Sequence, residues 1–217
     1  MIDIEQYIQD PCRTLATAFW KASHFPIPPN VVIAHKSDLA MHDTNFNGQV
    51  TTYFRLLNRL DTQNHFPLPN GFNFRQVSLP DDAATLADII NRSYNSYSHT
   101  ADSIMRWTNH PVFDPSLWLF VIDDLTNNPA AAGLADFDNT ITEGSLEWIQ
   151  VLPEYRGRGL GQAIVCELVN RLKHGNKAAF VTVSGECDNK TNPEALYRKC
   201  GFTGDDIWYV KFLQEVK

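Results

Sequence analysis

The stretch LPEYRGRGLGQA, residues 152–163, decides how the rest of this sequence is interpreted. It places Gly157, Gly159 and Gly161 between an apolar run and a segment with a helical pattern. An interior glycine weakens a helix by roughly 0.5–1 kcal/mol relative to alanine, so glycines at a helix start need a reason. A strand, a glycine-rich turn and a helix form an anion cradle, because the N–H groups of the first helical turn converge. The pattern predicts a phosphate-bearing ligand, with a purely structural tight turn as the alternative.

Two common nucleotide-binding loops do not match these letters. A Walker A loop needs a lysine directly after its last glycine, whereas Gln162 follows Gly161. A dinucleotide fingerprint needs G-x-G-x-x-G, which the glycine spacing does not provide. The phosphate-bearing ligand is therefore not expected to be bound by either of these two loop types.

Strand-like and helical segments alternate on both sides of the glycine stretch. The strands are predicted at residues 73–79, 116–123, 130–137, 145–151, 178–185 and 206–213, and the helices at 80–94, 101–110, 160–173 and 192–201. Within one helix, Leu160, Ile164, Leu168 and Leu172 stand four apart and form an apolar face. This order predicts a mixed α/β sheet with one central crossover.

Residues 1–71 differ in sequence pattern from the rest of the chain. The turn-rich FPLPNG segment at 66–71 marks a candidate boundary. A helix is predicted over 12–22, and strands over 31–35 and 49–57. We assign this part no chemistry from its sequence.

The composition excludes several classes of protein. Apolar residues make up 43% and charged residues 20% of the 217 residues, a globular balance. No window approaches the ~18 consecutive apolar residues of a membrane span, and no secretory signal is visible. The net charge of −7 lacks the basic excess that nucleic-acid binding needs. We expect a cytoplasmic protein that binds neither membranes nor nucleic acid.

No metal site is predicted. The four cysteines, Cys12, Cys166, Cys187 and Cys200, include no C-x-x-C pair, and the seven histidines include no H-E-x-x-H motif. We expect reduced thiols.

The glycine loop also carries an R-x-x-G-x-G pattern, formed by Arg156, Gly159 and Gly161 after a strand that ends Val151-Leu152-Pro153. This pattern resembles the acyl-CoA signature of the GCN5-related N-acetyltransferase (GNAT) family.

A second segment, LYRKCGF at 196–202, is similar to the L-Y-x-x-x-G-F segment that the family carries on the helix after the next strand. The resemblance covers residues 72–217 and leaves 1–71 as an N-terminal extension or small subdomain. It implies a mixed, mostly antiparallel sheet flanked by helices.

By this resemblance the co-substrate is acetyl-CoA. Its pyrophosphate is expected at the backbone of the glycine loop, with Arg156 adding charge, and its pantetheine arm at the backbone of 149–151. The cofactor-binding residues implied are Ile149, Gln150, Val151, Arg156, Gly157, Arg158, Gly159, Leu160, Gly161, Gln162 and Asn192. Asn189 matches the pantetheine asparagine as well as Asn192 does, and a helix cap alone explains Asn192.

The implied reaction moves an acetyl group to an amine through a tetrahedral intermediate. Tyr197 matches the family tyrosine that serves as general acid. Because a phenol has a pKa of about 10 and a thiol one of about 8.5, we expect Tyr197 chiefly to donate a hydrogen bond to developing charge. A tyrosine buried by its ring is the alternative.

Glu147 is the candidate base, by resemblance to relatives that place a base on this strand. A lysine-like amine is neutral in only about one of 10³ molecules at pH 7, whereas an α-amine is neutral in roughly one of ten. Strand alternation places Glu147 on the side of Ile149 and Val151. A structural ion pair explains Glu147 equally well.

Residues 91–107 fall where relatives line the acceptor pocket, which makes Tyr94, Tyr97, His99 and Trp107 acceptor candidates; an ordinary loop histidine is the alternative for His99. The expected function is acetylation of a small-molecule or protein amine by a monomer or homodimer. The alternative is a coenzyme A binding or interaction module with little turnover. The acceptor and the role of 1–71, as lid, dimer contact or subdomain, stay open.

Overall fold

The computed structural model describes residues 2–38, 50–61, 65–93 and 98–213. The chain divides into two compact units, one made of residues 60–181 and one of 1–59 together with 182–217. This division does not follow the family resemblance, so the predicted boundary after residue 71 stays a prediction.

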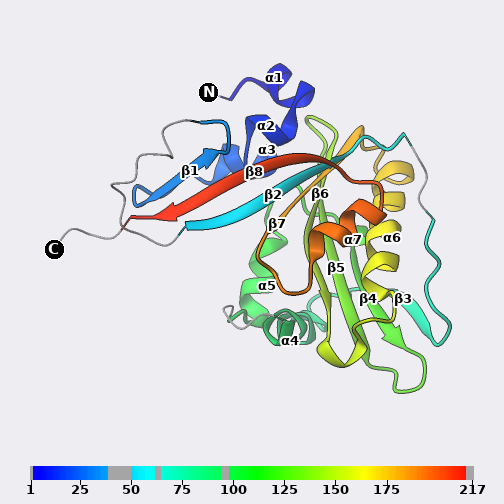
Figure 1. Cartoon of the computed structure of the whole chain (residues 1–217). Coiled ribbons are helices and arrows are strands. Elements are labelled where there is room, and N and C mark those ends of the chain that lie inside the picture. The colour runs from blue at the N-terminus through cyan, green and yellow to red at the C-terminus, as the bar shows by residue number, and fades with distance from the viewer. Residues whose placement is uncertain (1, 39–49, 62–64, 94–97, 214–217) are drawn as a thin grey trace. The chain divides into compact units, whose positions relative to one another are not determined.

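The unit of residues 60–181 contains an antiparallel array of four strands in the order β3-β4-β5-β6 (Figure 1). Its elements are β3 (Phe72–Gln76), α4 (Ala83–Ser93), α5 (Ala101–Trp107), the 3-10 turn η2 (Pro115–Leu117), β4 (Trp118–Asp123), β5 (Pro129–Asp138), β6 (Glu143–Val151), the 3-10 turn η3 (Pro153–Tyr155) and α6 (Leu160–His174). The elements predicted from the sequence over this part are all present, with ends shifted by a few residues.

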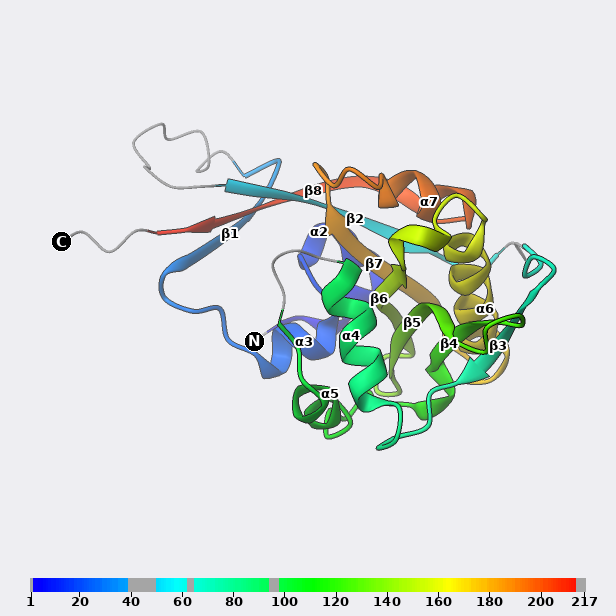
Figure 2. The same ribbon diagram turned by 90° about the horizontal axis from the view of Figure 1, so that it is seen from below.

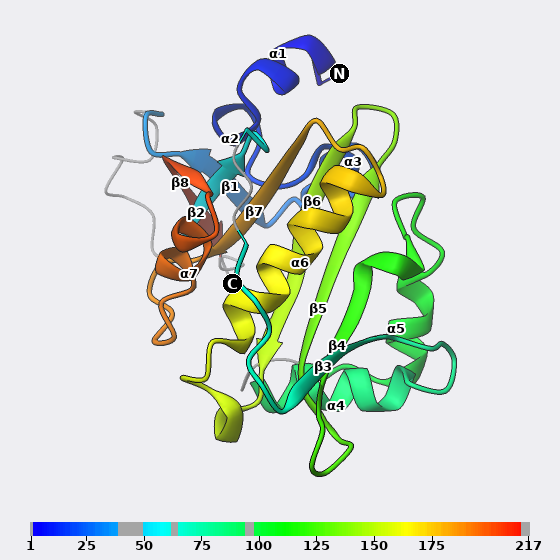
Figure 3. The same ribbon diagram turned by 90° about the vertical axis from the view of Figure 1, so that its right-hand side faces the viewer.

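Helix α6 covers one face of these strands, and α4 and α5 lie on the other (Figure 2). The predicted apolar face of α6 is buried, including Leu160, Ile164, Leu168 and Leu172. Gly133 on β5 lets the helix approach closely, because a methyl group there would overlap Cγ2 of Ile164. Figure 3 shows α6 lying along β5 and β6. The helix start, and the glycine loop before it, are thereby fixed relative to the strands.

The unit of 1–59 and 182–217 is built around β8 (Thr203–Phe212), which pairs antiparallel with both β1 (Val31–His35) and β2 (Val50–Asn58). Its other elements are α1 (Ile4–Gln9), α2 (Pro11–Thr14), α3 (Phe19–His24), β7 (Phe180–Glu186), which begins in the other unit, and α7 (Pro193–Lys199). The predicted strands are confirmed over 31–35 and 50–57, and residue 49 lies outside the described residues. The single helix expected over 12–22 is wrong: two short helices flank a break, where Ser184 donates to the carbonyl of Ala16 at 3.1 Å.

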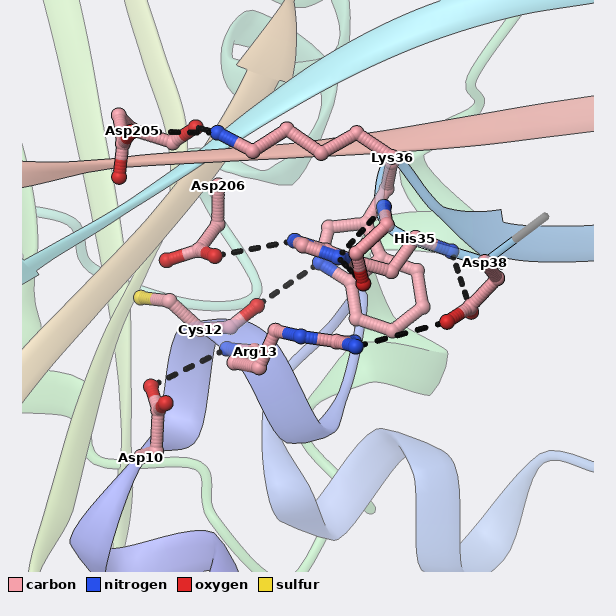
Figure 4. A network of polar contacts seen from close by, with 10 residues as sticks. Asp10, Cys12, Arg13, His35, Lys36, Asp38, Asp205 and Asp206 are labelled. Atoms are coloured by element: carbon pink, nitrogen blue, oxygen red, sulfur yellow. Dashed lines mark hydrogen bonds and ion pairs between the residues drawn. The ribbon is translucent and has the colours of Figure 1, made fainter.

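A polar network attaches α2 and β1 to β8 (Figure 4). Nε2 of His35, a side chain only 2% exposed, lies 3.0 Å from Asp206, and the indole N–H of Trp208 donates to the carbonyl of Cys12 at 2.8 Å. Arg13 and Asp38 add a longer pair at 3.5 Å. These contacts join α2 and β1 to the C-terminal strand, so both elements are part of this unit.

The expected fold class is confirmed. The described residues form eight strands in a mixed, mostly antiparallel α/β arrangement flanked by helices.

An ion pair at the start of α4 gives a test of stability. Asp82 accepts two hydrogen bonds from Arg75, at 2.7 and 3.1 Å, and one from the Ser78 N–H at 2.7 Å. The Arg75 hydrogen bond, followed by that of Ser78 and against the opposing effect of desolvation, lowers the pKa of the Asp82 carboxyl. A depressed folded-state pKa stabilises above the unfolded pKa, and this contribution is lost as the pH falls through the folded value.

We expect Asp82→Asn to lower the free energy of unfolding by about 1–2 kcal/mol at pH 7. The difference from wild type should shrink as the pH is lowered from 7 towards 3, measured by urea unfolding. Asp81→Asn, at the exposed neighbouring position, is the matched control. A loss that is independent of pH would contradict the ionic explanation.

Candidate functional site

The glycine loop connects β6 to α6 through η3. Gly157 and Gly159 have φ angles of +78° and +84°, in the left-handed region that favours glycine. Gly159 directly precedes the first residue of α6, and within the described chain no side chain caps this helix start. The positive end of the helix dipole therefore points at the loop, an arrangement that favours an anion there. The predicted cradle geometry is present.

Two arginines flank this loop. The Nε of Arg156 donates to the carbonyl of Val151 at 3.1 Å, and the guanidinium of Arg158 lies 5.1 Å from the ring centre of Tyr155. The Tyr155 hydroxyl donates to Asp123 at 3.0 Å, which holds the ring in place. Both arginines are exposed, so the loop presents positive charge to solvent.

The predicted pantetheine-binding residues Ile149, Gln150 and Val151 form the end of β6, immediately ahead of the loop. They pair with β5 opposite Gly133, Ala132 and Ala131. The Gln150 side chain is only 4% exposed. The structure thus brings the predicted strand residues and the glycine loop together in one unit.

Glu147 occupies a β-bulge. The register with β5 shifts between the pairs Leu146–Ala135 and Trp148–Leu134, so Glu147 is the extra residue on β6. Its carboxylate accepts a hydrogen bond from the Ser145 hydroxyl at 2.9 Å.

The expectation that Glu147 shares the side of Ile149 is wrong. Gly144 and Gly133 both face α6, and Ile149 pairs with Gly133 and faces the same way, so Ser145 points to the opposite face. Because the bulge changes the alternation, the Glu147 carboxylate leans towards Ser145 and the face of α5.

Tyr197 and Asn192 lie in the other unit, the one built around β8. Tyr197, on α7, is 7% exposed, and its ring packs against Phe54 and Phe202 with centroid distances of 6.1 and 5.8 Å. Asn192 caps α7, and its side chain accepts from the Ala195 N–H at 3.3 Å. The cap predicted from the sequence is confirmed, while the catalytic role of Tyr197 and the cofactor role of Asn192 stay predictions.

Comparison with known protein families agrees with this geometry. Residues 115–204, which include β6, the glycine loop, α6 and Tyr197, match the model of the acetyltransferase (GNAT) domain. These residues form a GNAT acetyltransferase domain. This assignment supports acyl transfer as the general activity.

Solved structures share the fold of this chain at low sequence identity. A GCN5-related N-acetyltransferase from Sphaerobacter thermophilus superposes with a TM-score of 0.70 and 18% identity, covering 95% of this chain and 64% of that one. A GNAT acetyltransferase from Colwellia psychrerythraea gives 0.61 and 9%, covering 85% and 64%. The ribosomal-protein-S18-alanine N-acetyltransferase of Escherichia coli gives 0.52 and 16%, covering 67% and 98%.

The chain therefore spans just under two thirds of the Sphaerobacter and Colwellia proteins. No curated protein sequence matches this chain.

None of the described helices is both long and apolar enough to cross a membrane. Over the same described residues, no group of three or more His, Cys, Asp or Glu side chains is arranged to hold a metal ion.

An aromatic cluster lies beside Glu147 in the unit of residues 60–181. Trp148 stacks on Trp107 of α5, with ring centres 5.6 Å apart and planes 8° apart, and His99 meets both rings edge-on at 5.1 and 5.3 Å. Desolvation lowers the pKa of the His99 imidazole, which favours its neutral form. Two further predicted acceptor residues, Tyr94 and Tyr97, lie outside the described residues.

Sequence reasoning missed three residues of this region: Trp148, Arg92 and Glu154. The sequence pattern marks Trp148 only as a strand residue, because its stacking partner Trp107 is 41 positions earlier in the sequence. Arg92 and Glu154 form an ion pair at 2.7 Å between α4 and η3. No short-range sequence pattern could have predicted this ion pair.

Proposed function

We propose that the GNAT domain transfers the acetyl group of acetyl-CoA to an amine by direct attack through a tetrahedral intermediate. The observation that carries this proposal is the uncapped start of α6 behind two left-handed glycines, with Arg156 and Arg158 exposed beside it. Such a helix start suits the diphosphate of coenzyme A.

The open space beside the loop supports this proposal. A Cβ added at Gly157 would meet no atom within 4 Å, so the space over this backbone is open, and the glycine leaves it to a ligand. Acetyl-CoA supplies an activated thioester. The chain's own residues then have to bind the phosphates and orient the pantetheine arm. They also have to remove a proton from the amine and help to supply one to the leaving thiolate.

In this proposal the backbone of Ile149–Val151 orients the pantetheine arm, and Glu147 accepts a proton from the amine, directly or through water. Tyr197 donates a hydrogen bond to the charge that develops on the leaving sulfur. The acceptor is a small-molecule or protein amine. A lysine-like acceptor needs the Glu147 base most, because it is almost fully protonated at pH 7.

Thermal unfolding with and without acetyl-CoA tests the cofactor. A ligand at about 100 times its Kd adds roughly 2.7 kcal/mol, and each kcal/mol raises the Tm of a protein of this size by roughly 2–4 °C. We expect a rise of several degrees with acetyl-CoA and none with NAD or ATP.

Gly159→Ala should weaken acetyl-CoA binding about tenfold, because alanine is strained at φ +84° and its methyl would lie 3.1 Å from the Phe66 ring. Gly71→Ala, at φ +87° in the turn before β3, carries the same backbone strain outside the loop and serves as the control. No shift with acetyl-CoA, or equal binding losses in both variants, would mean that the glycines are structural.

A further inference from the structure

The ion pair between Arg92 and Glu154 places a third guanidinium beside the glycine loop. Arg92 lies in the last turn of α4, and its Nη2 is 2.7 Å from Glu154 of η3, while its Nη1 is 3.4 Å from Asp88. The two side chains of the closer pair are 47% and 51% exposed. An exposed pair of this kind contributes little to the free energy of unfolding, so its position beside the loop matters more than its strength.

Glu154 is surrounded by positive charge. Besides Arg92, the Nη2 of Arg158 lies 3.5 Å from the Glu154 carbonyl, and the charge of Arg156 also acts on its carboxyl. A hydrogen bond from its own backbone N–H, followed by the charges of Arg92 and Arg156 and against opposing desolvation, lowers the pKa of this carboxyl. Glu154 is therefore ionised near neutral pH, and it is the carboxylate that pairs with Arg92 at η3.

A diphosphate at the start of α6 would be exposed to the charges of Arg156 and Arg158 in the loop and to those of the neighbouring pair, Arg92 and the Glu154 carboxylate. The carboxylate repels the phosphates and also occupies Arg92, which would otherwise be attracted to them. The cation and the carboxylate should thus have opposite effects on anion binding, although they form one ion pair.

We propose that Arg92 is a phosphate-binding residue of the acetyl-CoA site and that Glu154 is its competing counterion, which holds Arg92 beside the loop and limits cofactor affinity. This inference rests on the proposed function. It assigns a binding role to α4, an element outside the sequence motif of the loop.

Calorimetric titration of the full chain with acetyl-CoA tests the inference in Arg92→Gln, Glu154→Gln and the double variant. We expect Arg92→Gln to raise the Kd about 3- to 10-fold and Glu154→Gln to lower it about 2- to 5-fold. Both effects should shrink between about 50 and 200 mM salt, because exposed charges are screened. Arg13→Gln, at a partly exposed arginine that pairs with Asp38 in the unit built around β8, is the matched control.

The ligand series identifies which phosphate is bound. Loss of the Arg92→Gln effect with 3′-dephospho-CoA would indicate the 3′-phosphate, and an effect retained there but lost with pantetheine would indicate the diphosphate. Either result supports the inference.

Two outcomes overturn the inference while leaving the proposed function intact. One is wild-type acetyl-CoA binding that Arg92→Gln does not change. The other is equal weakening by both single variants and the double variant, which would mean that the pair only holds α4 against η3. Absence of binding by the wild-type protein would overturn the proposed function as well. Tm values without ligand confirm that each variant folds.

Discussion

Replacing Tyr197 by phenylalanine is expected to lower kcat by about 10²-fold or more, while the Kd for acetyl-CoA stays within about twofold of wild type. The change removes one hydroxyl and keeps the ring that packs against Phe54 and Phe202, so the fold should be preserved. The loss arises because the hydrogen bond to the leaving sulfur is made mainly in the transition state. Steady-state kinetics and calorimetry measure the two quantities.

Tyr209→Phe provides the matched control, because Tyr209 lies on β8 of the same unit and has no proposed role. Unchanged kcat in Tyr197→Phe would remove this residue from the mechanism. Wild-type protein that binds acetyl-CoA but acetylates none of a broad panel of amines would instead favour a coenzyme A binding module.

Adding a methyl group at Gly133 is expected to cause the largest loss of stability. In Gly133→Ala the new Cβ would overlap Cγ2 of Ile164 and lie 3.1 Å from Cδ1 of Leu168, both of which are buried between α6 and β5. Overpacking of this kind costs typically 1–3 kcal/mol, which corresponds to a fall in Tm of roughly 2–12 °C. Thermal unfolding measures it directly.

A double-mutant cycle isolates the cause of this loss. Ile164→Leu removes the Cγ2 branch at nearly constant volume, so Gly133→Ala should cost less in the Ile164→Leu background than in wild type. If Gly133→Ala lowers the free energy of unfolding equally in both backgrounds, contact with the Cγ2 branch of Ile164 is not the cause of the loss. Because α6 begins at the glycine loop, Gly133→Ala should also weaken acetyl-CoA binding.

Local signals were sufficient for most of the elements and for the loop. The strand ending in Val151, the glycines ahead of α6 and the apolar face from Leu160 to Leu172 are all short-range patterns, and the structure confirms each. The same is true of α7, because its Asn192 cap lies within three residues of its hydrogen-bond partner. Short-range patterns also led to the GNAT family, whose model covers residues 115–204.

Other features depend on partners that are distant in the sequence. The side taken by Glu147 follows from a bulge, which exists only in relation to the β5 register, and alternation within one strand therefore predicted it wrongly.

The sequence by itself determined the strand, glycine loop and helix in their order, the apolar face of α6 and the match to the GNAT domain, because each resides in residues a few positions apart. The tertiary structure alone decided the pairing of β1 and β2 with β8, the bulge at Glu147 and the ion pair between Arg92 and Glu154. These features depend on contacts between segments that only folding brings together. The pattern of one strand does not specify which strand pairs with it, and the charge of one residue does not specify its partner.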